Sequence, residues 1–109
     1  MDNPTIVVTW EPKYFPFYGS FAVLDAQPQK PIRIKGAGFN PKEQVRVTIC
    51  EKDTIIGEAV VNKCGAFEIH ANLPALPVGV VSVKAWVGKV VKAFWPLDIV
   101  KELPKPPKG

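Results

Sequence analysis

Apolar and polar residues alternate along several short stretches of this chain. Two of these stretches lie within residues 32–49, IRIKGAGFNPKEQVRVTI. Successive side chains of a β-strand point to opposite faces, so a period of two predicts a half-buried strand. The apolar members of the two alternating runs, expected to face a core, are Ile32, Ile34, Val45, Val47 and Ile49.

A corner is predicted between these two strands. Gly36 and Gly38 are expected to supply positive or strained φ where the chain turns, because glycine adopts such conformations at little cost. Phe39 is expected to be buried as an apolar plug, and Asn40-Pro41 to begin the turn with the proline φ already fixed. Residues 32–49 thus predict a strand, a corner and a second strand.

The same alternation of apolar and polar residues predicts the remaining strands. Strands are expected at 5–10, 55–62, 66–73 and 80–87, with a short edge strand at 21–25 and a last strand that ends at 98–101. Gly57 lies inside one of them, which indicates a bulge or an edge position. The side chains predicted to face inward in 66–73 and 80–87 are Phe67, Ile69, Ala71, Leu73, Val81, Val83, Ala85 and Val87.

The last hairpin has two possible registers. A two-residue loop, Gly88-Lys89, would push Lys92 inward opposite Ala85. A three-residue loop that includes Val90 makes every inward position apolar, with Ala85 opposite Ala93 and Val83 opposite Trp95. Because a one-residue slip moves every side chain to the other face, the three-residue loop is predicted. It would set Trp86 beside Lys92 and Lys84 beside Phe94 on the outer face.

Parts of the sequence resemble the immunoglobulin-like modules of bacterial and archaeal cell-surface or secreted proteins. The resemblance covers roughly residues 30 to 88 and rests on Gly36-x-Gly38-Phe39-x-Pro41-x-Glu43-x-Val45-x-Val47, Gly65-x-Phe67, Leu73-Pro74 and Gly79-x-x-Ser82-Val83-Lys84-Ala85. It implies an immunoglobulin-like β-sandwich of about seven antiparallel strands. The family includes spacers, adhesins and appendages of enzymes, so the resemblance is nearly silent on function.

Length and composition fit a single globular domain. The chain has 109 residues, of which 47% are hydrophobic and 22% charged, and its 12 prolines argue against long helices. We expect the domain to occupy residues 1–101 and residues 102–109 to be a Pro/Lys-rich linker or tail. The net charge is +4, but the basic residues do not form a continuous stripe of positive charge. This argues against nucleic acid as a partner.

Apolar runs are too short for a transmembrane helix, so direct membrane insertion is not expected. The start of the chain lacks the pattern of a signal peptide. Either the chain is cytoplasmic, or it is an excised domain of a secreted protein whose signal lay upstream. We favour the second explanation, and therefore an extracellular or cell-envelope location.

Few residues of this sequence are candidates for catalysis, metal binding or a disulfide. Cys50 and Cys64 are expected about 20 Å apart along a hairpin, too far for a disulfide, so two free thiols are predicted. His70 is the single histidine and lies between Glu68 and Asn72 on a predicted outward face. No nucleophile motif, zinc ligand set, calcium loop or phosphate-binding glycine loop is recognised. The sequence therefore predicts a non-enzyme without a cofactor or metal.

Exposed aromatic residues are the remaining candidates for binding. Residues 13–21 are rich in Tyr and Phe; they either cap one end of the sandwich or form an open platform. On the last hairpin, aromatic rings are expected beside lysines, where cation–π contacts can form. The predicted binding residues are Trp86, Phe94, Lys84, Lys92, Tyr14 and Tyr18.

The sequence favours two alternative functions over a third, an accessory domain of an enzyme. The first is a structural or spacer module of a larger extracellular or cell-envelope protein, with weak adhesion as an additional role and the neighbouring domains as partners. The alternative is a binding module for carbohydrate or cell-wall polymer, because a flat aromatic ring can cover the apolar face of a sugar. On the outer face, Trp86 either offers its ring to a ligand, packs over its lysine neighbours, or is covered by the N-terminal aromatic segment.

Overall fold

A computed structural model describes residues 3–10, 25–49 and 54–101, and this part of the chain is all β. Its eight strands are β1 (Thr5–Trp10), β2 (Asp25–Ala26), β3 (Pro31–Ala37), β4 (Gln44–Ile49), β5 (Thr54–Val60), β6 (Phe67–Asn72), β7 (Gly79–Val87) and β8 (Val90–Ile99). The described part contains no helix long and apolar enough to span a membrane.

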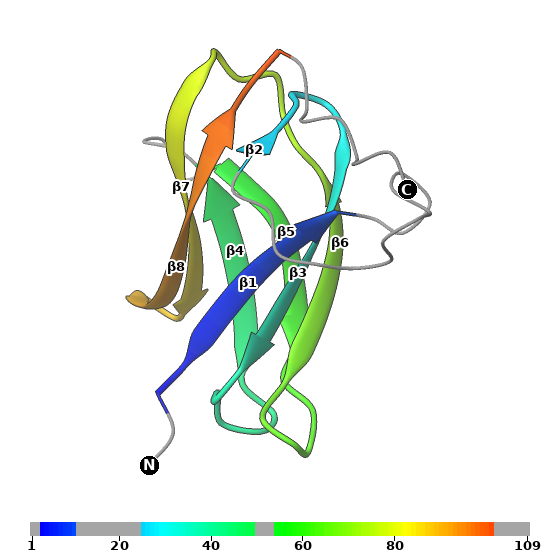
Figure 1. The fold of residues 1–109 in the computed structure, drawn as a ribbon. Helices are drawn as coiled ribbons and strands as arrows, with labels where there is room; N and C mark the ends of the chain where they lie inside the picture. Colours follow the sequence, from blue (N-terminus) through cyan, green and yellow to red (C-terminus); the bar gives the residue numbers. More distant parts are fainter. Residues whose placement is uncertain (1–2, 11–24, 50–53, 102–109) are drawn as a thin grey trace.

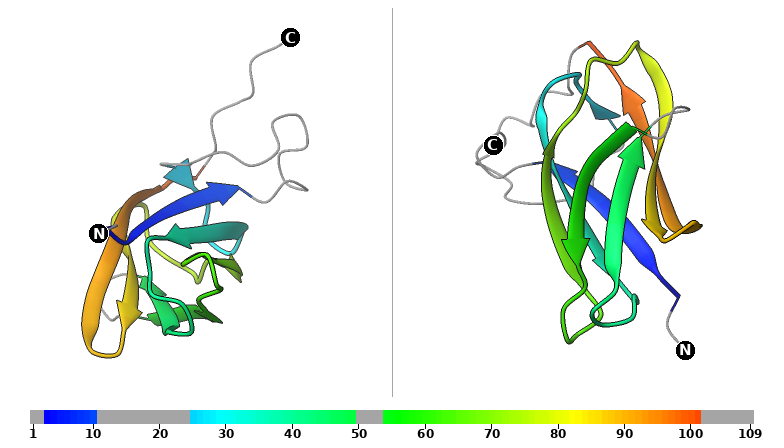
Figure 2. Two further views of the ribbon diagram at one scale, coloured as in Figure 1. Left: turned by 90° about the horizontal axis from the view of Figure 1, so that it is seen from below. Right: turned by 180° about the vertical axis from the view of Figure 1, so that it is seen from behind.

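The strands form two sheets packed face to face (Figure 1). One sheet has three strands in the order β1-β3-β6, and the other has five in the order β2-β8-β7-β4-β5. The sheets also approach each other at their sides, where β5 packs beside β6 and β1 beside β8. The views from below and from behind show this curled, sandwich-like arrangement (Figure 2).

The apolar members of the alternating runs fill the space between the sheets. Strand β6 alternates buried and exposed residues from end to end, as predicted. Val81, Val83 and Ala85 of β7 are buried as well, whereas Val87 at the end of that strand is half-buried. The largest fully buried apolar side chains of the core are Val8, Ile32, Ile34, Val45, Val47, Ile49, Leu73, Val83, Leu97 and Ile99. Burial of these residues is the main favourable term for folding.

The predicted corner exists, but its two glycines serve different purposes. Phe39 is 5% exposed and meets the ring of Phe67 edge to face, with 5.1 Å between the ring centroids. Gly38 has a φ of 78°, as expected for a turn. The prediction of unusual φ at Gly36 is wrong, because Gly36 is an ordinary strand residue paired with Phe67. A Cβ there would overlap the Phe67 ring, so Gly36 is needed for space.

A compact turn follows this corner. The Asn40 amide donates to Glu43 Oε1 over 3.2 Å, and the Glu43 amide donates back to the Asn40 carbonyl over 3.3 Å. Pro41 lies between them, and Lys42 takes a φ of 71°. The prediction that Asn40-Pro41 begins the turn is confirmed.

The last hairpin combines features of both registers that the sequence allowed. Val87 pairs with Val90, so the loop is Gly88-Lys89 and the predicted three-residue loop is wrong. The register then shifts between Ala85 and Trp86, and from there the predicted pairs Ala85–Ala93 and Val83–Trp95 are present. A β-bulge thus absorbs one extra residue and keeps the core side apolar.

Gly57 lies in β5, which is at the edge of the five-stranded sheet. The pairing of β4 with β5 shifts between Val47, opposite Gly57, and Thr48, opposite Ile55. The predicted edge position and bulge are therefore both present. A Cβ at Gly57 would overlap the side chain of Ile69, which makes glycine the residue that fits against β6.

The count and direction of the strands differ from the prediction of about seven antiparallel strands. The additional strand, β2, has two residues and pairs in parallel with β8 through Asp25–Asp98 and Ala26–Ile99. The expected edge strand at 21–25 overlaps β2 only at Asp25. Residues 21–24, Cys50 and the predicted tail 102–109 lie outside the described residues.

The described chain begins and finishes at opposite ends of the sandwich (Figure 1). Asn3 lies against Gly38, just beyond the last residue of β3. The Val100 amide donates to the Ala26 carbonyl over 2.9 Å, beside the connection that leads into the first residue of β3. Because β3 has seven residues, these two points are separated by roughly 23 Å along the strands.

Candidate functional site

The outer face of the five-stranded sheet carries the predicted binding residues of the last hairpin. We use "outer face" for the solvent side of β8, β7, β4 and β5, where side chains alternate with those of the core. The side chains that define it are Phe94, Lys92, Val91, Val80, Ser82, Lys84, Trp86, Arg46, Thr48, Ile55 and Glu58.

Trp86 is held in place on this face. Its indole Nε1 donates to Thr48 Oγ1 over 2.8 Å, and the Arg46 guanidinium carbon lies 5.3 Å from the ring centroid. Arg46 Nη2 in turn donates to the Gly88 carbonyl over 3.3 Å, which fixes the guanidinium over the ring. Such a stack is a cation–π contact, worth about 0.5–1 kcal/mol at an exposed site. Trp86 is accordingly half-buried and packs within the sheet surface.

The cation on Trp86 therefore differs from the one expected. The sequence predicted Lys92 beside the indole, but the bulge pairs Trp86 with Val91. Arg46 reaches the ring because β4 lies next to β7, a neighbour that is distant in sequence. The sequence predicted that Trp86 packs over its lysine neighbours; in the structure the cation stacked on its ring is Arg46.

Phe94 is open to solvent. It is 71% exposed and lies opposite Lys84, the cross-strand partner that the sequence predicted. Lys92 is also exposed, on the outward bulge beside Val91. Phe94 is thus the aromatic ring of this face that a partner could reach, and two lysines lie near it.

Exposed aliphatic side chains continue the apolar surface on both sides of the lysine. Val80 of β7 is 75% exposed and Ile55 of β5 is 55% exposed. Val80 borders a shallow hollow whose wall includes Leu76 and Val78 of the β6–β7 connection. Three exposed apolar side chains, Phe94, Val80 and Ile55, therefore lie on this one sheet face. Sequence periodicity could have found Val80, since it is apolar in an outward phase.

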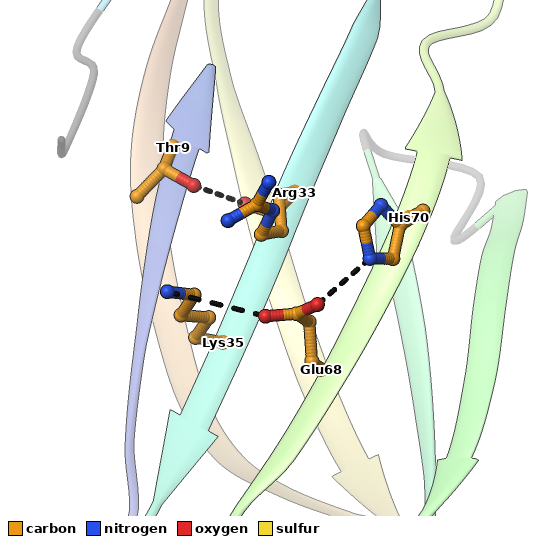
Figure 3. A network of polar contacts seen from close by, with 5 residues as sticks. All are labelled: Thr9, Arg33, Lys35, Glu68 and His70. Carbon is orange, nitrogen blue, oxygen red and sulfur yellow. Dashed lines mark hydrogen bonds and ion pairs between the residues drawn. The ribbon is translucent and has the colours of Figure 1, made fainter. Parts of the chain in front are cut away.

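A second polar cluster lies on the outer side of the three-stranded sheet (Figure 3). Glu68 Oε1 lies 3.9 Å from Lys35 Nζ, and Glu68 Oε2 lies 2.7 Å from His70 Nε2. The Thr9 hydroxyl donates to the backbone carbonyl of Arg33 over 3.3 Å on the neighbouring strands. The Glu68 and His70 side chains are about half exposed, so these contacts are screened by water and contribute little to stability.

This cluster matches the prediction that His70 faces outward beside Glu68. The sequence did not point to Lys35, which joins them because β3 pairs with β6. Among the described residues, no group of three or more His, Cys, Asp or Glu side chains could hold a metal ion. Cys64 is a free, exposed thiol in the turn before β6.

The other predicted binding residues, Tyr14 and Tyr18, lie outside the described residues. A comparison of the chain with protein-family models, with curated proteins and with solved structures found no match.

Proposed function

We propose that this chain is an immunoglobulin-like module that acts as a non-catalytic spacer in a larger extracellular or cell-envelope protein. The observation that carries the proposal is the placement of Asn3 and Val100 at opposite ends of the sandwich. A module crossed from end to end by its chain extends a multidomain protein along the strands. Its partners are then the domains before and after it.

The order of the strands supports the immunoglobulin-like part of the proposal. In that fold, strands C, F and G form one sheet and strands A, B and E belong to the other. Here β4, β7 and β8 are neighbours in one sheet, and β1, β3 and β6 form the other. Strand β5 then corresponds to an added strand beside C. A fold of this kind does not by itself define a function, so the spacer role needs its own test.

The spacer role is tested by joining two copies of the full chain in tandem. The nine residues of β7 span roughly 30 Å, so a copy added end to end should lengthen the molecule by at least that amount. Small-angle X-ray scattering of one and two copies measures this increment. An increment far below 30 Å would mean that the copies fold back side by side, and the spacer proposal would be wrong.

A second candidate function, carbohydrate binding, is favoured by Phe94 alone. Its ring is 71% exposed beside Lys84, which suits an acidic or neutral polymer with an apolar sugar face. Trp86 argues against a wide platform, because Arg46 lies over its ring. Chemical-shift titration with soluble wall polymers tests this function. Perturbations of the Lys84 signals that vanish in Phe94→Ala support it, and their absence in the unchanged protein contradicts it.

A further inference from the structure

We propose that the outer face is a self-complementary surface through which two copies of this chain pair. The two-fold axis runs parallel to the strands, between β7 and β4. This inference goes beyond the spacer function and does not depend on it. It rests on two rows of side chains that cross the face from β8 to β5.

The first row has apolar ends and a polar middle. Phe94 is opposite Lys84 across β8 and β7, and Lys84 is opposite Thr48 across β7 and β4. Thr48 is opposite Ile55 on β5, which completes the row. Phe94 and Ile55, its two ends, are 71% and 55% exposed.

The second row has ends of opposite charge. It begins at the bulge on β8, where Lys92 is exposed next to Val91, and Val91 is opposite Trp86. Trp86 is opposite Arg46, and Arg46 is opposite Glu58 on the edge strand β5. A cation therefore lies at one side of the face and a carboxylate at the other.

A two-fold axis parallel to the strands exchanges the two sides of the face. Phe94 of one copy then lies against Ile55 of the second copy, and Lys92 lies against Glu58 of the second copy. Both contacts occur twice, as in any isologous pair. Apolar ends meet apolar ends and opposite charges meet, so a single operation satisfies both rows.

The other two-fold axis in the plane of the face is less favourable. An axis across the strands can lie on only one row at a time. On the first row it brings Lys84 against Lys84, and on the second row it brings Arg46 against Arg46; like charges brought together at an interface oppose association. Midway between the rows it brings Phe94 against Lys92, which loses the apolar contact.

The size of the face sets the expected strength. Four strands spaced about 4.8 Å apart give a width near 19 Å, and a strand length of about 25 Å gives roughly 500 Å² for each copy. The pair would bury about 1,000 Å² in total, at the lower limit for specific association. We therefore expect a weak dimer with a dissociation constant in the micromolar range.

The experiment is sedimentation equilibrium of the full chain, with reversal of the two charges. Lys92→Glu and Glu58→Lys should each weaken association roughly tenfold, because like charges then meet at both symmetric contacts. The double variant Lys92→Glu/Glu58→Lys should restore it. Glu68→Lys is the matched control: Glu68 is an exposed carboxylate on a strand of the other sheet, so association should be unchanged.

Three results would overturn the proposal. The chain could remain monomeric at millimolar concentration, the double variant could fail to recover, or Glu68→Lys could disrupt association as strongly as Glu58→Lys. A covalent tandem holds its two copies at a high effective concentration, at which the outer faces can pair within one molecule. The scattering test of the spacer role is therefore repeated on a tandem in which both copies carry Glu58→Lys and Phe94→Lys. A short increment that persists in this variant contradicts the spacer, whereas one that lengthens in the variant reports the pairing.

Discussion

Replacing Phe39 by alanine should destabilise the domain strongly. Phe39 is 5% exposed, its ring meets Phe67 at a centroid distance of 5.1 Å, and its amide donates to the Gly65 carbonyl over 3.1 Å. The side chain thus fills the corner between β3 and β4 beneath the turn before β6. Deletion of a buried aromatic ring costs about 3–5 kcal/mol, from lost burial and from the cavity left behind.

Phe94→Ala is the matched control. The same atoms are removed, but the ring is 71% exposed and no cavity can form beneath it. A change within about 0.5 kcal/mol is expected at such a surface position. Comparison of the two variants therefore separates the stability contributed by burial of the ring from the general effect of removing a phenyl group.

Urea denaturation, followed by circular dichroism, measures the free energy of unfolding of both variants. With a slope near 2 kcal/mol/M, a loss of about 4 kcal/mol lowers the midpoint by roughly 2 M. Domains of this size are stable by about 5–15 kcal/mol, so Phe39→Ala would leave a folded domain with about 1–11 kcal/mol of stability. If Phe39→Ala cost less than about 1 kcal/mol, or no more than Phe94→Ala, the corner would not be part of the core.

Gly36→Ala should lower the free energy of unfolding by about 1–3 kcal/mol in urea denaturation, because the new methyl group overlaps a packed ring; a gain in stability would contradict this overlap. Thr48→Val should cost about 1 kcal/mol by the same assay, since the Trp86 indole loses its acceptor, and an unchanged stability would contradict the bond. Deletion of Lys92 should leave a folded protein, as judged by dispersed NMR signals, because it removes the bulge and keeps the core register. Deletion of Ala93 should destabilise the domain strongly by the same measurement, because loss of the bulge then places Lys92 at the buried position opposite Ala85.

Local alternation was sufficient to predict most strands and their inward faces. Every residue of β6 lies on the side that its period of two predicts. The reason is that a half-buried strand imposes its pattern on the sequence directly. The exposed position of Phe94 and its pairing with Lys84 were predictable on the same basis, because both follow from the register of one hairpin.

Contacts between strands distant in sequence were not predictable. Arg46 lies over Trp86 because β4 is placed beside β7, and no local pattern gives that order. The prediction of an unusual φ at Gly36 was wrong for the same reason. The absence of a side chain at Gly36 makes room for the ring of Phe67 on another strand. Glycine in a strand can therefore indicate close packing across the sheet as well as a turn.

The last hairpin explains how two conflicting signals are both satisfied. Gly88 has a φ of 61°, which suits a two-residue loop, whereas the core requires Ala85 opposite Ala93. These requirements differ by one residue, and the bulge absorbs the difference. The inserted position carries Lys92, whose charge is tolerated only toward solvent. A charged residue out of phase in an apolar alternation therefore indicates a bulge, and here that bulge also gives the outer face its cation opposite the side that carries Glu58.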